Sequence, residues 1–252
     1  MIDIIASYGY NNFFGGYGMG YGRYGMYFDP TYILVIIGVV ISLFASARVR
    51  TTFSKYQREM ARCGLTGAQV AERLMHANGI YDVRIEHVSG SLSDHYDPSK
   101  KVLRLSDSVY ANRSISAVAV AAHEVGHCIQ HAKGYAPLNI RTSLVPVANI
   151  GSTLSWVFII AGLVFAKFYY LVTVGIVLFS AAVLFQIVTL PVEFNASSRA
   201  LTALENNGIL YSDELAKGRK VLSAAALTYV AAAAAAILQL LRLLLLYGRR
   251  RD

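Results

Sequence analysis

The chain has 252 residues, 55% of them hydrophobic, and a formal net charge of +8 at pH 7. Its mean hydropathy of +0.45 is too high for one soluble domain of this length, so the composition indicates a membrane protein. The positive charge does not indicate nucleic-acid binding, because the lysines and arginines border apolar stretches and are not interleaved with aromatic residues on a soluble face. Contact with anionic lipid headgroups explains them more simply.

Residues 1–30 form a low-complexity tail that is rich in tyrosine and glycine. So much glycine disfavours a stable helix, and the tyrosines favour the interface between lipid and water. We expect this tail to lie outside the membrane and to have no catalytic role.

Four stretches approach or exceed the roughly 20 apolar residues that a helix needs to cross a bilayer. They predict a transmembrane helix at residues 31–47, a transmembrane hairpin at residues 144–190, and a hydrophobic helix with a basic tail at residues 221–252. The last helix is the weakest, because alanine dominates its first half and Arg242 interrupts its second half. It either crosses the membrane or packs as a re-entrant helix.

Lysines and arginines follow the first span, precede the second, and lie between the third and the fourth. All these segments fall on one side of the membrane, which the positive-inside rule assigns to the cytoplasm. We therefore expect a multi-pass protein of the cell membrane with residues 48–143 and 191–220 on the cytoplasmic side. A fully crossing last helix would leave the basic tail outside, which is the argument for the re-entrant alternative.

Within residues 48–143, an amphipathic helix is predicted at Thr66–Asn78, and Gly79 caps it. Two segments alternate as half-buried strands do, Val83–Val88 and Lys101–Leu105. The residues between these strands, Gly90–Pro98, are expected to form a turn region. An exposed strand edge there could hold an extended peptide by main-chain hydrogen bonds.

The segment His123–His131 contains the pattern H-E-x-x-H within an alanine-rich helix. Ser114 is a typical helix start, and Gly134 and Pro137 end the helix. Two histidines four residues apart lie on one helix face, about 6 Å apart along its axis. Their imidazoles can therefore converge on one Zn²⁺.

In this interpretation His123 and His127 are metal ligands, and Glu124 is the general base for a water activated by the metal. The pattern also arises by chance, and two surface histidines on an amphipathic helix are the alternative. The surrounding helix, however, is expected to be largely buried, where histidines and a carboxylate are costly unless something satisfies them. A metal would do so.

A zinc peptidase needs a third protein ligand. His131 lies about 12 Å along the helix from His123, too far to share one ion, so we expect it to support a ligand or to lie at the helix end. Glu193 follows the third span directly, on a new helix expected to start near Pro191 at the cytoplasmic mouth of the bundle. Its alternative is a surface glutamate at a helix N-terminus, and spacing does not separate the two readings.

Four segments together resemble one known family, the YugP-like neutral zinc metallopeptidases, which are bacterial membrane proteins distantly similar to HtpX-type proteases. These segments are His123–His127, Leu190–Ala200, Asp94–Pro98 followed by Leu103–Ser106, and Val221–Val230. The resemblance spans approximately residues 42–245.

The resemblance implies a mainly α-helical membrane protein with three to four transmembrane helices and a small α+β, zincin-like cytoplasmic domain. It implies Glu193 as the third zinc ligand beside His123 and His127, with Glu124 as the catalytic base. HtpX-type enzymes carry an aspartate four residues after the ligand glutamate, and Ser197 stands at that position here. We expect Ser197 to support a histidine ligand.

The expected function is that of a zinc-dependent endopeptidase that hydrolyses membrane or membrane-proximal proteins with a metal-activated water. Its expected partners are the lipid bilayer and protein or peptide substrates. His95 and Tyr96 are candidates for donors to the oxyanion of the scissile bond, and a polar turn without a catalytic role is their alternative. A zinc-binding, non-hydrolytic membrane scaffold stays open as the rival function. A metal transporter is disfavoured, because the predicted spans contain no histidine or acidic residue.

Overall fold

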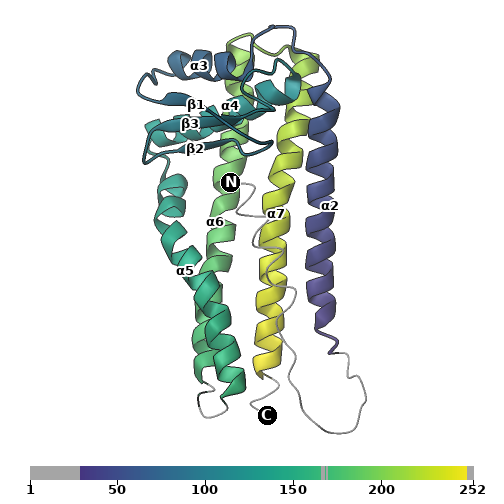
Figure 1. Ribbon diagram of the computed structural model, residues 1–252, viewed down its shortest axis with the longest axis vertical. Coiled ribbons are helices and arrows are strands. Elements are labelled where there is room, and N and C mark those ends of the chain that lie inside the picture. Colours follow the sequence, from purple (N-terminus) through teal and green to yellow (C-terminus); the bar gives the residue numbers. More distant parts are fainter. Residues whose placement is uncertain (1–28, 166–167, 169, 249–252) are drawn as a thin grey trace.

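The computed structural model describes residues 29–165, 168 and 170–248, so the predicted tail falls outside this range except for its last two residues. Four long helices run side by side, and a small extramembrane part lies at one end of them (Figure 1). Each is long and apolar enough to cross a membrane, which confirms the prediction of up to four spans. These helices are α2 (Tyr32–Gln57), α5 (Ala136–Val164), α6 (Tyr170–Asn206) and α7 (Ser212–Gly248).

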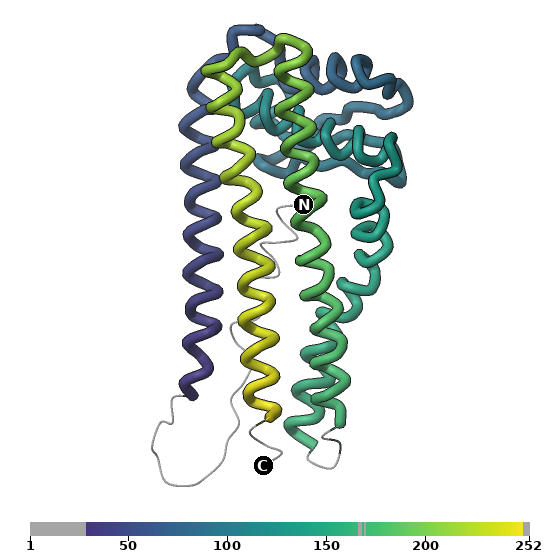
Figure 2. The backbone as a smooth tube through the Cα atoms, turned by 180° about the vertical axis from the view of Figure 1, so that it is seen from behind, coloured from purple at the N-terminus to yellow at the C-terminus, as the bar shows by residue number. Residues whose placement is uncertain are grey.

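The four helices are arranged as two pairs. Helix α5 packs on α6, α2 packs along α7, and contacts between α6 and α7 join the pairs (Figure 2). Small residues allow the close approach of α5 and α6, because a Cβ at Gly175 would lie only 2.7 Å from the carbonyl oxygen of Ser155. The predicted hairpin of residues 144–190 is therefore a tightly packed helix pair.

Helix α6 continues without a break through Pro191, so the prediction of a new helix starting there is wrong. A proline inside a helix removes one backbone hydrogen bond, and this loss does not end α6. At 1.5 Å per residue, the 37 residues of α6 span about 55 Å, well beyond the hydrocarbon core of about 30 Å. The same helix therefore provides a membrane span and the segment that carries Glu193.

Helix α7 also has 37 residues and is long enough to cross the membrane. Near its far end Arg242 lies 3.9 Å from a carboxylate oxygen of Asp29 and stacks over the ring of Tyr32 at 4.1 Å. These contacts place an acidic group and an aromatic ring beside the one charge that interrupts the hydrophobic half of α7. Helix α7 is thus continuous and long enough to cross, and its full crossing stays a prediction.

The extramembrane part contains α3 (Gly67–Ala77) and α4 (Ile115–Ala132), both close to their predicted bounds. Thr66 and Gln69 form a reciprocal capping box at the start of α3. The Ser114 hydroxyl accepts a hydrogen bond from the backbone N–H of Ala117 at the start of α4. The hydroxyl residue expected to begin the motif helix is therefore confirmed.

A three-stranded sheet lies beside these helices in the order β1-β3-β2. Its strands are β1 (Arg84–Val88), β2 (His95–Asp97) and β3 (Val102–Ser106), with β1 parallel and β2 antiparallel to β3. The expected turn region therefore contains a strand, and β3 is central and almost wholly buried instead of alternating. Strand β2 has only three residues, too few for an alternating pattern to be recognised in the sequence. Strand β3 is buried because it pairs with a strand on each side.

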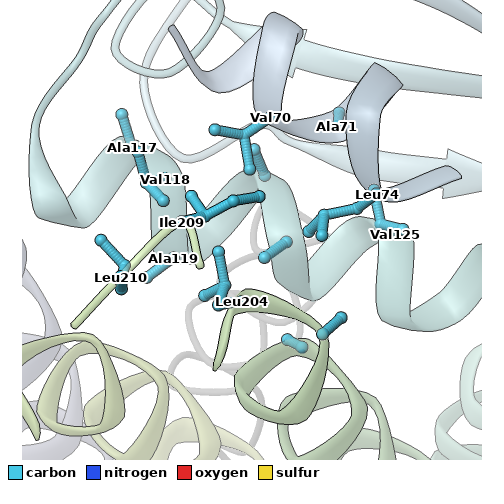
Figure 3. Packing of buried hydrophobic residues seen from close by; sticks show 14 of the residues in the cluster. Val70, Ala71, Leu74, Ala117, Val118, Ala119, Val125, Leu204, Ile209 and Leu210 are labelled. Carbon is cyan, nitrogen blue, oxygen red and sulfur yellow. The ribbon is translucent and has the colours of Figure 1, made fainter. Parts of the chain in front are cut away.

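The main hydrophobic core joins α3, α4 and the last turns of α6. Figure 3 shows Val70 and Leu74 of α3, Val118 and Val125 of α4, and Leu204 of α6 pointing into one cluster, and all five are fully buried. This core fixes the extramembrane end of α6 against α4. The side chains that precede it on α6 are therefore brought to the face of the motif helix.

Candidate metal centre

Helix α4 presents the two histidines of the motif side by side, with ring centroids 4.8 Å apart. Helix α6 brings Glu193 between them. The Oε2 atom of Glu193 lies 3.2 Å from Nε2 of His123 and 3.6 Å from Nε2 of His127. One ligand atom from each of the three residues thus lies within 4.8 Å of the others.

Gly126, inside the motif, explains how α6 can approach so closely. A Cβ at this position would lie 2.4 Å from the carbonyl oxygen of Ala196, closer than any real Cβ contact. Only a glycine allows the backbones to meet here. Ala196 is three residues after Glu193, so this contact sets the distance between the carboxylate and the two imidazoles.

A second residue holds each histidine at its other ring nitrogen. Ser197 Oγ lies 3.1 Å from Nδ1 of His123, the contact that we expected for Ser197. The Nδ1 atom of His127 lies 3.0 Å from Oε1 of Gln130, which is an acceptor, so Nδ1 carries the proton. This tautomer leaves Nε2 of His127 with a free lone pair directed at the centre.

Gln130 was missed in the sequence, although it is fully buried and central to the site. Its Nε2 donates to the carbonyl of Val192 at 2.8 Å and to Oδ1 of Asn195 at 3.0 Å. Asn195 Oδ1 also accepts from Arg199 at 2.7 Å. Gln130 therefore connects a candidate ligand on α4 to α6. Gln130 lies three residues after His127 on a helix expected to be buried, so the sequence could have indicated that it contacts this histidine.

Glu124 is buried with 7% of its surface exposed, and its Oε2 atom has no hydrogen-bond partner among the described residues. Burial raises the pKa of Glu124 to about 7, an effect that the neighbouring His123 partly offsets. Such a carboxylate can accept and release a proton near neutral pH.

Glu193 is 1% exposed and follows the predicted end of the third span by three residues. Burial by itself raises the pKa of this carboxyl, but His127 and His123 outweigh it and hold the pKa below its ordinary value. Glu193 is thus an ionised carboxylate deep in the protein, as a metal ligand must be. The alternative of a surface glutamate at a helix N-terminus does not fit this burial.

The three side chains fit a zinc ion in type and spacing. Zinc is bound by imidazole nitrogen and carboxylate oxygen at about 2.0–2.2 Å with tetrahedral geometry, which places neighbouring ligand atoms about 3.4 Å apart. The separations from Glu193 Oε2 to the two Nε2 atoms, 3.2 and 3.6 Å, lie on either side of this value. A fourth position would stay open beside Glu124.

The chain matches the model of a protein family described as "Putative neutral zinc metallopeptidase" over residues 31–248. It belongs to this family. A relative named "Putative membrane protease YugP", from Bacillus subtilis (strain 168), is 46% identical over 219 residues, which is 87% of this chain and 97% of the relative. No solved structure matches the chain.

Membership of this family agrees with the resemblance read from the motifs, and its description implies zinc. Its match covers every described helix and strand, including the four candidate spans. The extramembrane part contains a three-stranded sheet, which by itself does not establish a zincin-like fold. The zincin-like character of this part stays a prediction.

The remaining predicted residues have other contacts. The Tyr96 hydroxyl is 2.8 Å from Nδ1 of His131, in the last turn of α4, so this pair joins β2 to the helix end. His95 has Nδ1 against the carbonyl of Ser93 at 2.9 Å and Nε2 against Arg104 at 3.2 Å. These contacts link the two side chains to their neighbours on the sheet and on α4, and their role as oxyanion donors stays a prediction.

Proposed function

We propose that this family member is a membrane-integrated, zinc-dependent endopeptidase that hydrolyses peptide bonds of membrane or membrane-proximal proteins. The observation that carries the proposal is the convergence of His123, His127 and Glu193 beside the buried base Glu124. Ligands of this kind at this spacing, with an open fourth position, are typical of catalytic zinc sites.

Each residue of the centre would have one role. Nε2 of His123, Nε2 of His127 and Oε2 of Glu193 would hold the ion. Zinc bound there would lower the pKa of a water molecule towards neutrality and polarise a peptide carbonyl. Glu124 would accept the proton of the attacking water at Oε2, which has no hydrogen-bond partner in the described part of the chain, and then pass it to the departing amine nitrogen.

The position of the centre supports a substrate close to the bilayer. Glu193 follows the predicted end of a span by three residues, and α4 lies across the extramembrane end of the helix bundle (Figure 1). Strand β2 is an edge of the sheet and packs against α4, so an extended peptide could pair with it near the motif helix. We place this end on the cytoplasmic side, because the segments between spans that carry several lysines and arginines lie there.

The direct test uses full-length protein in liposomes with a library of fluorogenic peptides, either tethered to lipid or free in solution. Glu124→Gln should retain zinc and lose about 100- to 10,000-fold in cleavage rate. Glu72→Gln, an exposed glutamate of α3, is the matched control and should behave as wild type.

Wild-type protein that binds zinc but cleaves no peptide, together with normal cellular function of Glu124→Gln, would instead favour the non-hydrolytic scaffold. Equal rates on tethered and free peptides would remove the membrane-proximal part of the proposal and leave the hydrolase part standing.

A further inference from the structure

A chain of hydrogen bonds runs outward from His127 to a charged residue. Gln130 lies between Nδ1 of His127 and Oδ1 of Asn195. The same Asn195 oxygen accepts a hydrogen bond from Nε of Arg199 at 2.7 Å. Gln130 is fully buried, and Asn195 and Arg199 are half-buried beside it. The inner end of the chain is thus a candidate metal ligand, and its outer end is a cation.

The direction of each hydrogen bond follows from the outer end of this chain. An arginine can only donate, so the atom of Asn195 that faces Arg199 must be its carbonyl oxygen. Gln130 faces the same oxygen and must therefore turn its NH₂ group toward it. This NH₂ group also donates to the carbonyl oxygen of Val192 at 2.8 Å. The Gln130 oxygen is therefore left for Nδ1 of His127.

A reversed chain would remove the lone pair that His127 needs as a metal ligand. If the amide of Asn195 turned over, its NH₂ group would face the NH₂ group of Gln130, and neither would have an acceptor there. A Gln130 amide that turned over as well would present NH₂ to Nδ1 of His127, and the imidazole proton would move to Nε2. Arg199 opposes this arrangement, because it requires an acceptor on Asn195.

Arg199 also contacts the connection between α4 and α5. Its guanidinium carbon lies 5.7 Å from the ring centroid of Tyr135, within the range of a cation–π contact. The backbone N–H of Tyr135 donates to the carbonyl oxygen of Gln130 at 2.9 Å, so the contacts return to the residue that holds His127. Tyr135 immediately precedes α5. The contacts of Arg199 therefore join α4, α6 and the start of a candidate span.

We propose that Arg199 is a positioning residue of the metal centre, whose hydrogen bond to Asn195 orients the Gln130 amide and so keeps Nε2 of His127 free for zinc. The inference rests on the proposed zinc site. It assigns a role to a residue that lies six positions after the candidate ligand Glu193 and acts on a different ligand.

The test is a zinc titration of full-length protein in detergent against a chromophoric chelator. Arg199→Met removes the donor and should weaken zinc binding about 3- to 10-fold, less than the loss of a group that contacts a ligand directly. Arg199→Gln should stay within about twofold of wild type, because Nε2 of glutamine and Nε of arginine are both the fourth atom beyond Cα. Arg84→Met, at an exposed arginine of β1, is the control and should bind zinc as wild type does.

A double-mutant cycle separates this role from a general effect on packing. If Arg199 acts through Gln130, Arg199→Met should change zinc affinity less than about twofold in a Gln130→Ala background. Cobalt in place of zinc should give a shifted ligand-field absorption spectrum in Arg199→Met but not in Arg199→Gln. If Arg199→Met does not fold, Asn195→Ala breaks the same chain and should show the same loss and the same dependence on Gln130.

Equal losses in Arg199→Met and Arg199→Gln would overturn the proposal, because the charge or the contact with Tyr135 would then act in place of the hydrogen bond. Additive losses in the double-mutant cycle would overturn it as well. The titration needs no peptidase activity, so wild-type protein that binds zinc without cleaving peptides would refute only the proposed function. Wild-type protein that binds no zinc would refute both.

Discussion

At the scale of single residues, the centre is built from two layers of contacts. The inner layer is His123, His127 and Glu193, and the outer layer includes Ser197 and Gln130. The Gln130 contact fixes the tautomer of His127, and both contacts hold the two imidazoles by Nδ1, which leaves Nε2 for the centre. They add little to the stability of the fold individually, but an ion is sensitive to displacements of a few tenths of an ångström.

Gln130→Ala should weaken zinc binding about 10- to 100-fold, because it removes the acceptor at Nδ1 of His127 and frees the ring to rotate. Equilibrium titration with zinc measures the change. Gln69→Ala is the control, since it removes a glutamine of the α3 capping box and should leave zinc affinity unchanged. Equal affinities for the two variants would contradict the role assigned to Gln130.

The pH dependence of cleavage should report Glu124. A general base acts only when it is deprotonated. We therefore expect kcat/KM to decrease as the pH falls through the pKa of Glu124. Burial raises that pKa to about 7, and a bound cation beside it would lower it again. We therefore expect the midpoint of the acid limb below pH 7. The residual activity of Glu124→Gln should lack this limb, and an unchanged limb in that variant would assign it to another group.

At the scale of elements, the decisive contact is the crossing of α4 and α6 at Gly126 and Ala196. The extramembrane core holds the end of α6, and the glycine lets its backbone touch α4 one turn beyond Glu193. The motif histidines and the third carboxylate meet because two helices distant in sequence cross at this one point.

Gly126→Ala should separate the two helices. A methyl group 2.4 Å from a carbonyl oxygen cannot be accommodated without backbone movement, and overpacking of this kind typically costs about 1–3 kcal/mol. We expect a lower melting temperature and a loss of bound zinc. Gly218→Ala is the control within α7, because its Cβ would meet the flexible end of Leu210 at 3.3 Å. Wild-type zinc content in Gly126→Ala would contradict this explanation.

At the scale of the whole molecule, the segments between spans that carry several basic residues lie at the same end of the bundle as the sheet (Figure 1). The connection between α5 and α6 lies at the opposite end. This arrangement is what the alternation of four crossing helices requires. The end that carries the sheet therefore faces either the cytoplasm or the outside of the cell.

Cysteine labelling answers that question. Ser99→Cys places an exposed thiol after β2, and Phe168→Cys places one in the α5–α6 connection. Both are made with Cys63→Ser, while Cys128 is buried and should stay unreactive. A membrane-impermeant maleimide should label position 168 in intact cells and position 99 only in inverted vesicles. The reverse pattern would place the candidate centre outside the cell.

The amino-acid sequence by itself determined the membrane class, the four apolar stretches, the motif helix with its start at Ser114, and the candidate ligands. Each of these depends on local composition or on a spacing within one helix. Glu193 stayed open on spacing alone, because its distance from the histidines is set by contacts between helices that are 70 residues apart in the chain.

The tertiary structure alone decided the rest. It carried α6 through Pro191, formed strand β2 within an expected turn, and joined Tyr96 of β2 to His131 at the end of α4. It also added Gln130, whose role depends on its partners Val192 and Asn195 on α6. Local patterns report how a segment meets water or lipid, whereas pairing and packing between distant segments decide which side chains meet one another.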